Sequence, residues 1–514
     1  MSLGQVMLVA VLAVPAVGAV LVAALPKRAD RAARVVGVGV AAAAFIFSLL
    51  LYASANAGWF AYTGSGRPAI APWHELNLPW APGLDLHFHL GVDGISYPLV
   101  LLTTLLTLLC CGYTLWRVPE GGPGRLLVAL LLVIEVGILG TFLALDLVLF
   151  FVFFEVVLLP MYAVIAGWGG AQRRRAARKF VLYTLFGSVL LLVGIFTVVA
   201  AAGTSDLVAL VRVPDAAAFG SDGGMSRTTQ IAAFTLLALA FAVKSPLWPL
   251  HTWLPAAHTE APTVGSVILA GVLLKMGTYG MIRVAVGVAP EGARFAAPVL
   301  GLLAVAAIIV GSLVCLAQTE LKRLIAYSSV SHMGFVLLGI ATLTATGLQA
   351  ALIGNIAHGV ITALLFFLAG AVKDRAGTGL LAELGGLRER APGLAALLGF
   401  AAIASLGLPG LAGFWGEAFA VVAAVGKGGP FWVTLGVLAA VGGALTAAYF
   451  LRLLRRVTHG GPAPAVARLT PRLAGAELAT WSPLVALALI IGLLPVLVLG
   501  VTGDPVNSLL EAVP

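Results

Sequence analysis

The chain has 514 residues, of which 61% are hydrophobic and only 10% charged, and its formal net charge is +9. Soluble domains carry roughly 25% charged residues, so this composition excludes a soluble globular protein. The basic residues are scattered over many short loops and form no single face, which excludes a nucleic-acid-binding protein. Apolar runs of about 20 residues recur from end to end, each long enough to cross a bilayer. We therefore predict an all-α, polytopic membrane protein surrounded by lipid.

The apolar runs predict about fourteen spans, and the basic residues predict their orientation. The first run has no basic region before it, and Lys27 and Arg28 follow it, which favours a retained helix over a signal peptide. With both termini facing outward, 22 of the 30 lysines and arginines, including Lys322 in an inner loop, lie on the inner side, and six, including Arg283, lie on the outer side. In chain order the predicted spans lie near 3–25, 35–53, 94–116, 126–144, 147–166, 180–202, 230–250, 263–286, 295–317, 324–343, 349–372, 394–424, 430–452 and 480–502.

The longest predicted outer loop, 54–93, carries no visible catalytic set. Its alternating segment LDLHFHLGVDG predicts a small hairpin. The three cysteines of the chain lie in apolar runs, without the spacing of a metal site or a disulfide. No phosphate-binding glycine loop and no metal-spaced His/Asp cluster occurs either. The sequence therefore predicts no metal and no cofactor bound to this chain.

Two acids lie inside early spans, where a charge costs at least roughly 2.5–3.5 kcal/mol and is a functional candidate by default. Glu155 is surrounded by apolar residues in LVLFFVFFEVVLLPMY, and Glu135 lies in the preceding span. Two acids on adjacent helices can share a proton. The alternative for each is a protonated side chain bonded to a neighbouring helix, and for Glu135 both interpretations stay open.

Two lysines lie in the next predicted spans. Lys244 is followed at once by SPLWPLHTWLP, whose prolines cannot donate backbone hydrogen bonds, so the helix must break just after the lysine. Broken helices at membrane depth are the layout that transporters use for ion sites. Lys275 lies mid-span in SVILAGVLLKMGTYG, among glycines that permit close packing or a local bulge. One lysine could be a counter-ion for Glu155, but two exceed what one acid needs, which favours a relay.

Histidines follow the lysines in the sequence. His332 and His358 lie in consecutive spans, and histidine can pass a proton through either ring nitrogen. A lone membrane histidine is more often a helix-contact residue, but the pair, placed between the lysines and the next acid, favours a relay. A haem held by these two histidines would leave the lysines and acids unexplained. His251 and His258 flank the broken segment, where they either admit protons or cap it.

Glu417 closes the series in SLGLPGLAGFWGEAF, where proline and glycines mark a second interrupted helix. Breaks at corresponding positions of two five-helix units are typical of an inverted repeat. We predict the repeats in spans 4–8 and 9–13, with the broken helices in spans 7 and 12. The predicted division is an N-terminal three-helix segment, two five-helix repeats, and a linker with the last span, at 1–125, 126–290, 291–455 and 456–514.

These residues and their motifs resemble the antiporter-like subunits of respiratory complex I. The resemblance runs from FHLGVDGIS at 88–96 to the break at 405–417, and its most specific blocks are AVKSPLWPLHTWLPAAHTEAPTVGS, ILAGVLLKMGTYG and AQTELKRLIAYSSVSHMGFVLLG. It implies a modulating ion pair between Glu155 and Lys244. It also implies a proton relay into the second half of the chain, formed by Lys275, His332, His358 and Glu417.

Within that family the chain resembles the M type of bacterial complex I, because FWGEAF carries an acid where the L and N types carry lysine. The resemblance implies a subunit of NADH:quinone oxidoreductase in the bacterial inner membrane, with the L-type and N-type subunits as partners. NADH, FMN, iron–sulfur clusters and quinone are then expected in partner subunits. The rival interpretations are a subunit of a multi-subunit Na⁺/H⁺ antiporter, to which the resemblance extends, a membrane subunit of a hydrogenase-linked complex, and a structural scaffold.

Overall fold

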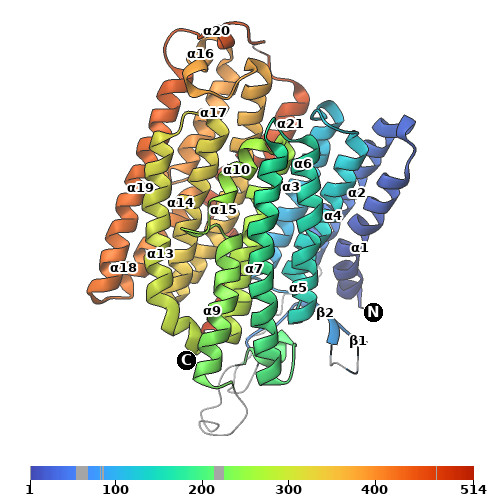
Figure 1. The fold of residues 1–514 in the computed structure, drawn as a ribbon, viewed down its shortest axis with the longest axis vertical. Coiled ribbons are helices and arrows are strands. Elements are labelled where there is room, and N and C mark those ends of the chain that lie inside the picture. The colour runs from blue at the N-terminus through green and yellow to red at the C-terminus, as the bar shows by residue number, and fades with distance from the viewer. Residues whose placement is uncertain are drawn as a thin grey trace.

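The computed structural model describes residues 2–53, 68–81, 83, 86–212, 225–470 and 472–513. Long helices stand side by side along the long axis of the molecule (Figure 1). Twelve helical stretches among the described residues are long and apolar enough to cross a membrane, which confirms the predicted class. Two interrupted helices take the places predicted for spans 7 and 12, so the predicted total of about fourteen agrees with the structure.

The helices in chain order are α1 (Leu3–Ala24), η1 (Lys27–Ala29), α2 (Asp30–Ala53), α3 (Tyr97–Trp116), α4 (Gly124–Leu143), α5 (Leu147–Val156), α6 (Leu158–Trp168), α7 (Arg173–Ala202), α8 (Leu207–Leu210), α9 (Arg227–Lys244), α10 (Trp253–Glu260), α11 (Thr263–Ile268), η3 (Leu269–Leu273), α12 (Leu274–Gly280), η4 (Met281–Val286), α13 (Pro290–Ala317), α14 (Leu321–Thr342), α15 (Ala345–Ala376), η5 (Leu381–Glu383), α16 (Leu387–Arg390), α17 (Pro392–Ser405), α18 (Ala412–Gly426), α19 (Gly429–Thr458), α20 (Pro464–Ala467), α21 (Gly475–Leu493) and α22 (Val496–Glu511). η3 and η4 are π-helical, so 263–286 is one continuous helix with two wider stretches.

The predicted hairpin is present as an antiparallel pair, β1 (His74–Ala81) and β2 (Leu86–Val92), in which Leu76 lies opposite Leu90. We call the end of the bundle with this hairpin the hairpin end. The opposite end, where α16 and α20 lie, is the arginine end (Figure 1). Both chain ends are marked toward the hairpin end, as the topology prediction requires of a chain whose termini share one side.

The break after α9 forms where the prolines predict it. Pro246 and Pro249 cannot donate to the carbonyls one turn earlier, and residues 245–252 turn instead of continuing the helix. Buried carbonyls freed by such a break need other donors. The carbonyl of Val243 accepts from the Trp253 indole at 3.0 Å, and that of Phe241 accepts from the Ser245 hydroxyl at 2.6 Å. Side-chain donors therefore replace the backbone hydrogen bonds that these two carbonyls lose at the interruption.

The second break separates α17 from α18. Gly407 and Gly410 both take positive φ, 77° and 91°, a region that residues with a Cβ rarely adopt. Pro409 between them cannot donate a helical hydrogen bond. A smaller interruption at Val157 divides the fifth span into α5 and α6, because Pro160 cannot donate to the carbonyl of Val156. It lies next to Glu155.

The predicted last span, 480–502, was placed too far along the chain. The observed helix α21 runs from Gly475 to Leu493, and a separate helix, α22, begins at Val496. Pro495 lies between them and cannot donate to the carbonyl of Ile491, so one continuous helix cannot pass through it. Apolar residues continue on both sides of the proline, which is why the hydropathy of the sequence suggested a single span.

The centre of the bundle consists of three helices. Every residue in the best apolar window of 263–286 is buried, as are 94% of the corresponding windows in α14 and α15. By contrast only 28% of the window in α19 is buried. Lys275, His332 and His358 lie on these three central helices. The most buried part of the molecule therefore carries ionisable side chains.

Candidate functional site

Lys275 lies at the centre of the site and is fully buried. Its Nζ lies 2.6 Å from Nδ1 of His358 and 2.5 Å from the carbonyl oxygen of Ala270. Ala270 belongs to the π-helical η3, whose wider turn leaves a carbonyl for the ammonium group. The bulge that the glycines around Lys275 suggested is therefore present and supplies a contact to the lysine.

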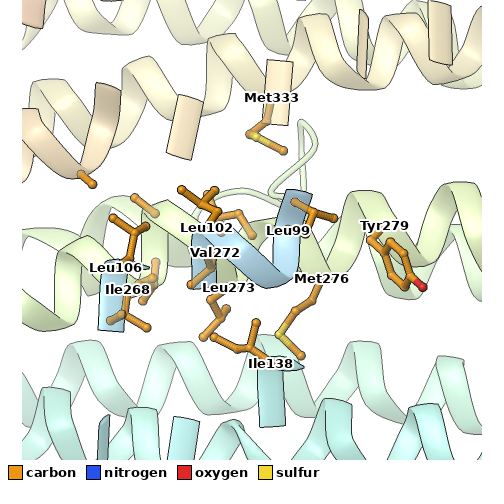
Figure 2. Close-up of a cluster of buried hydrophobic side chains, with 14 of the residues drawn as sticks. Leu99, Leu102, Leu106, Ile138, Ile268, Val272, Leu273, Met276, Tyr279 and Met333 are labelled. Carbon is orange, nitrogen blue, oxygen red and sulfur yellow. The ribbon is translucent and has the colours of Figure 1, made fainter. Parts of the chain in front are cut away.

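The helix of Lys275 is otherwise packed against apolar side chains. Leu273 and Met276, which flank the lysine in sequence, belong to a cluster with Ile138 of α4 and leucines of α3 (Figure 2). All three are fully buried. Interactions of a charge are stronger in such a low-dielectric setting than in water. The hydrogen bond to His358 is thus the main polar contact by which a proton can leave Lys275 toward α15.

The series continues from His358 through His332 to Glu417. The rings of the two histidines lie 5.9 Å apart at 60°, and Nδ1 of His332 lies 2.7 Å from Oε1 of Glu417. Nε2 of His332 lies 3.0 Å from the Ser405 hydroxyl, a partner that the sequence did not suggest. Nε2 of His358 is buried and has no hydrogen-bond partner in the part of the chain that the structure describes.

A small cavity joins these groups. It is lined by His332, His358, Ser405 and Glu417 and holds about 20 Å³ of space for the centres of water molecules. A cavity needs roughly 10–15 Å³ by this measure to hold one water, so it has room for a water molecule beside the two histidines. Gly354, Gly413 and Gly416 complete part of its wall. The site therefore has both the side chains and the space for proton transfer along α14, α15 and α18.

At the other side of the site, Glu155 and Lys244 are close but not directly paired. Oε1 of Glu155 accepts a hydrogen bond from the Ser188 hydroxyl of α7. Nζ of Lys244 lies 4.5 Å from the centre of the Phe154 ring. Glu155 is nevertheless the carboxylate whose charge acts on Lys244. The ion pair implied by the resemblance is thus separated here, with an alternative partner for each charge.

The two lysines lie on helices that touch at the break. A Cβ on Gly277 would lie 2.8 Å from the backbone nitrogen of Ser245, so α12 passes directly against the residue after Lys244. No direct contact joins Lys244 to Lys275 in this part of the structure. Transfer between them would need a bridging water or a side-chain movement.

His258 has a more central place than the sequence indicated. It is fully buried, stacks on Phe366 at 4.5 Å, and neither ring nitrogen has a hydrogen-bond partner among the described residues. The charges of Lys322 and Lys275 both act on it. His251, by contrast, lies at the break with its ring 6.2 Å from that of Tyr327. His258 is therefore positioned between the arginine end and the central lysine.

Lys322 was assigned from the sequence to an inner loop as an orientation signal. The structure places it at the start of α14, only 5% exposed, with Nζ 3.1 Å from the carbonyl of Ala261. Its position at a span boundary hid this burial, because hydropathy does not show which way a terminal side chain points. Charges of Glu260, Glu320 and Lys373 act on it, so it connects the arginine end with the interior.

Glu135 is not joined to the series. It is fully buried on α4, and neither carboxylate oxygen has a hydrogen-bond partner within the described chain, so it shares no proton with Glu155 by direct contact. Its charge acts on the neighbouring Cys111. The role predicted for Glu135 stays a prediction.

The sequence counted Arg283 with the outer-side residues, but the structure shows that it is buried. Its side chain is 2% exposed and pairs with the Asp93 carboxylate at the end of the hairpin. The helix extends to Val286 through the π-helical η4, which carries the arginine into the protein.

Among the residues described, no group of three or more histidines, cysteines and acids is placed to hold a metal ion.

Comparison with known families and proteins gives consistent matches. Residues 144–442 match the family described as "NADH:quinone oxidoreductase/Mrp antiporter, TM". The chain is 40% identical over 511 residues to the NADH-quinone oxidoreductase subunit M of Rhodobacter capsulatus, covering 97% of this chain and 94% of the relative. It is 39% identical to an NAD(P)H-quinone oxidoreductase chain 4 of Trichormus variabilis, covering 88% and 81%.

Solved structures share the fold. A chain of respiratory complex I from Thermus thermophilus superposes with a TM-score of 0.84 at 31% identity, covering 99% of this chain and 100% of the other. A chain of the Mrp complex from Dietzia sp. DQ12-45-1b gives 0.83 at 22% identity and covers all of both chains. At that identity the second likeness concerns the fold alone.

Proposed function

Because the chain belongs to the family of NADH:quinone oxidoreductase and Mrp antiporter membrane subunits, we propose that it is a proton-translocating membrane subunit of a respiratory complex I. The observation that carries this proposal is the hydrogen-bonded contact of Lys275 with His358, continued through His332 to Glu417 in the buried centre of the molecule. A scaffold would not need charges there, where each is costly.

The central transfer runs from Lys275 to His358. The ammonium group donates to Nδ1 of His358, and transfer of its proton makes the imidazole cationic. Nε2 then carries a proton that a water in the adjoining cavity can relay to His332. Nδ1 of His332 passes it to the Glu417 carboxylate at 2.7 Å. Each step moves one proton between groups that can both bind and release it.

The coupling to the driving reaction is electrostatic. When Lys244 leaves the Phe154 ring and approaches Glu155 to about 4 Å, the pair gains roughly 4 kcal/mol at an effective dielectric of about 20. When the pair separates, this stabilisation of the ammonium is lost and its proton is released more readily toward Lys275. Ser188 holds the carboxylate in the separated state. The short distance between α9 and α12 at Gly277 supports transfer between the lysines.

Protons enter from the arginine end through Lys322 and His258. Both are buried, and the charges of Lys322 and Lys275 act on His258. His251 lies at the same break and is the alternative entry residue. The predicted orientation places the arginine end in the cytoplasm and both chain termini outside a bacterial inner membrane.

The redox reaction takes place in partner subunits. NADH, FMN, iron–sulfur clusters and quinone would be bound there, and the L-type and N-type antiporter-like subunits would be neighbours in the membrane. The similar chain in respiratory complex I from Thermus thermophilus supports partners of this kind. The two inverted repeats, 126–290 and 291–455, would each supply one broken helix to the path.

The test is NADH-driven proton uptake by membrane vesicles that carry Lys275→Met, with assembly checked on native gels. We expect uptake to fall at least about tenfold and quinone reduction to slow with it. Lys427→Met is the control, since that lysine is exposed at the hairpin end and lies over Trp432, outside the series. An assembled Lys275→Met complex that pumps normally contradicts the proposal. Sodium-driven proton exchange without NADH would favour the antiporter alternative.

A further inference from the structure

Three polar side chains follow one another along one face of the central helix. Lys275, Tyr279 and Arg283 are four residues apart, so they share a face that leads from the middle of the molecule to the hairpin end. Eight residues of helix span about 12 Å. A proton on Lys275 would find its shortest way out along this face rather than sideways to α15.

The lysine itself is held away from that route. Its Nζ contacts the carbonyl of Ala270, which precedes it, and His358 on α15. Tyr279, the next residue of this row, is 1% exposed, and its hydroxyl donates to the carbonyl of Phe142 at 2.9 Å. Figure 2 shows Tyr279 at the margin of the apolar cluster formed with Met276 and its neighbours. The tyrosine proton is therefore committed to a backbone acceptor.

The route ends at a buried ion pair. Arg283 and Asp93 are 2% and 4% exposed, and their side chains are bonded to each other. The second oxygen of Asp93 accepts from the backbone N–H groups of Ile95 and Ser96, both at 3.0 Å. The guanidinium group has donors but no acceptor and does not lose its proton in proteins. The arginine therefore offers no position for a passing proton, and both oxygens of Asp93 already accept hydrogen bonds.

We propose that the Arg283–Asp93 pair seals the direct way from Lys275 to the hairpin end, so that the proton must leave sideways through His358. The fixed positive charge of Arg283 repels an approaching proton, as cationic groups in pores exclude protons and cations. This inference rests on the proposed function, because it assigns the pair to the same relay. It gives Arg283 the role of a positioning residue that directs the proton without carrying it.

The competing interpretation is a purely structural clamp. Asp93 directly follows β2, and its ion pair with Arg283 holds the hairpin against the central helix. A clamp needs the hydrogen bond, whereas a seal needs the charge. The double variant Arg283→Gln with Asp93→Asn separates the two, because neutral amides can keep a hydrogen bond while the charge is removed.

The experiment measures passive proton leak. Purified complexes carrying the double variant are reconstituted in proteoliposomes without NADH, and the decay of an imposed pH gradient is followed. We expect a leak at least about tenfold above that of the unmodified complex. The control replaces a partly buried ion pair, Arg375→Gln with Glu477→Gln, whose atoms lie 2.6 Å apart on α15 and α21. This control should remain tight.

Two further variants make the result specific. Adding Lys275→Met to the double variant should abolish the leak, since the proton must pass through that lysine. Asp93→Asn alone keeps the cation and should stay tight. A double variant as tight as the unmodified complex, or a leaky Asp93→Asn, would overturn the seal. Failure of the relay itself is a different result, namely normal NADH-driven pumping by Lys275→Met, so the two proposals can fail separately.

Discussion

Lys244 lies 4.5 Å from the centre of the Phe154 ring, while the neighbouring Glu155 is bonded to Ser188. A cation over an aromatic face gains about 0.5–2 kcal/mol, the upper value where water is excluded. That energy is smaller than the roughly 4 kcal/mol of a close ion pair, but of a size that an approaching charge can outweigh. The proposed switch therefore needs an approaching charge that offsets the difference of roughly 2–3.5 kcal/mol between the two arrangements.

Replacing Phe154 should shift this balance. In Phe154→Leu the separated state loses the ring contact, and we expect NADH-driven pumping to fall between about twofold and thirtyfold. Phe154→Trp should restore it, since indole binds cations at least as well. Phe150→Leu is the control, because the Phe150 ring stacks on Phe154 at 5.9 Å and its replacement by leucine removes a similar volume. Equal losses in the two leucine variants would show that packing, and not the cation, matters.

For single residues, the sequence was informative where a charged side chain lies within an apolar run. Glu155, Lys244 and Lys275 could be selected because apolar neighbours surround them, and the helices do bring Lys275 together with the later histidines. Lys322 and Arg283 were misassigned because both lie near span boundaries, where hydropathy cannot distinguish a loop charge from a buried one. Their burial depends on which way the helix surface faces, and this is set by tertiary packing.

Among the elements, the hairpin is fastened by a second polar cluster outside the spans. His89 of β2 lies 2.6 Å from Glu75 and 2.8 Å from Asp206. Burial alone would lower the pKa of His89, but hydrogen bonds and charges from Asp206 and Glu75 outweigh it and raise the pKa to about 9. The same pairing lowers the pKa of Asp206 against the effect of its burial.

The stability of the hairpin should therefore depend on pH. The pKa of His89 is higher in the folded than in the unfolded chain, so its contribution is complete below about 6.5 and lost as pH rises through about 9. The difference corresponds to at most about 3 kcal/mol. Hydrogen-exchange protection factors of β1 and β2 should fall between pH 6 and 9.5 and become less pH-dependent in His89→Gln. Protection that stays constant over this range in the unmodified protein would refute the assignment.

The breaks in the helices were predictable to different degrees. Pro246 and Pro249 predict the end of α9, and the region of Gly407 to Gly410 predicts the end of α17. The π-helical η3 and η4 have no comparable signature, because glycines permit a wider turn without requiring one. The division of the C-terminal helix at Pro495 could have been read from the proline alone.

For the whole molecule, composition and run length predicted the class, and the most buried helices are those that carry the histidines and the central lysine. Ionisable residues within membrane spans are rare, and they almost always face the interior of the bundle, where they mark ion and proton pathways. The inverted repeat and its boundaries remain predictions, since they rest on the two breaks alone. What the sequence could not provide is the path itself, because contacts between Lys275, His358 and His332 join residues from separate helices.

The most direct test of the central claim is the number of protons pumped per NADH oxidised by a complex carrying His358→Leu. This substitution removes both nitrogens between Lys275 and His332 and leaves a side chain of similar bulk. We expect an assembled complex with at least about a tenfold loss of the pumping that depends on this subunit. His459→Leu, at an exposed histidine after α19, should change nothing. An assembled His358→Leu complex with an unchanged ratio would contradict the account, because the proton could not then be passing through His358.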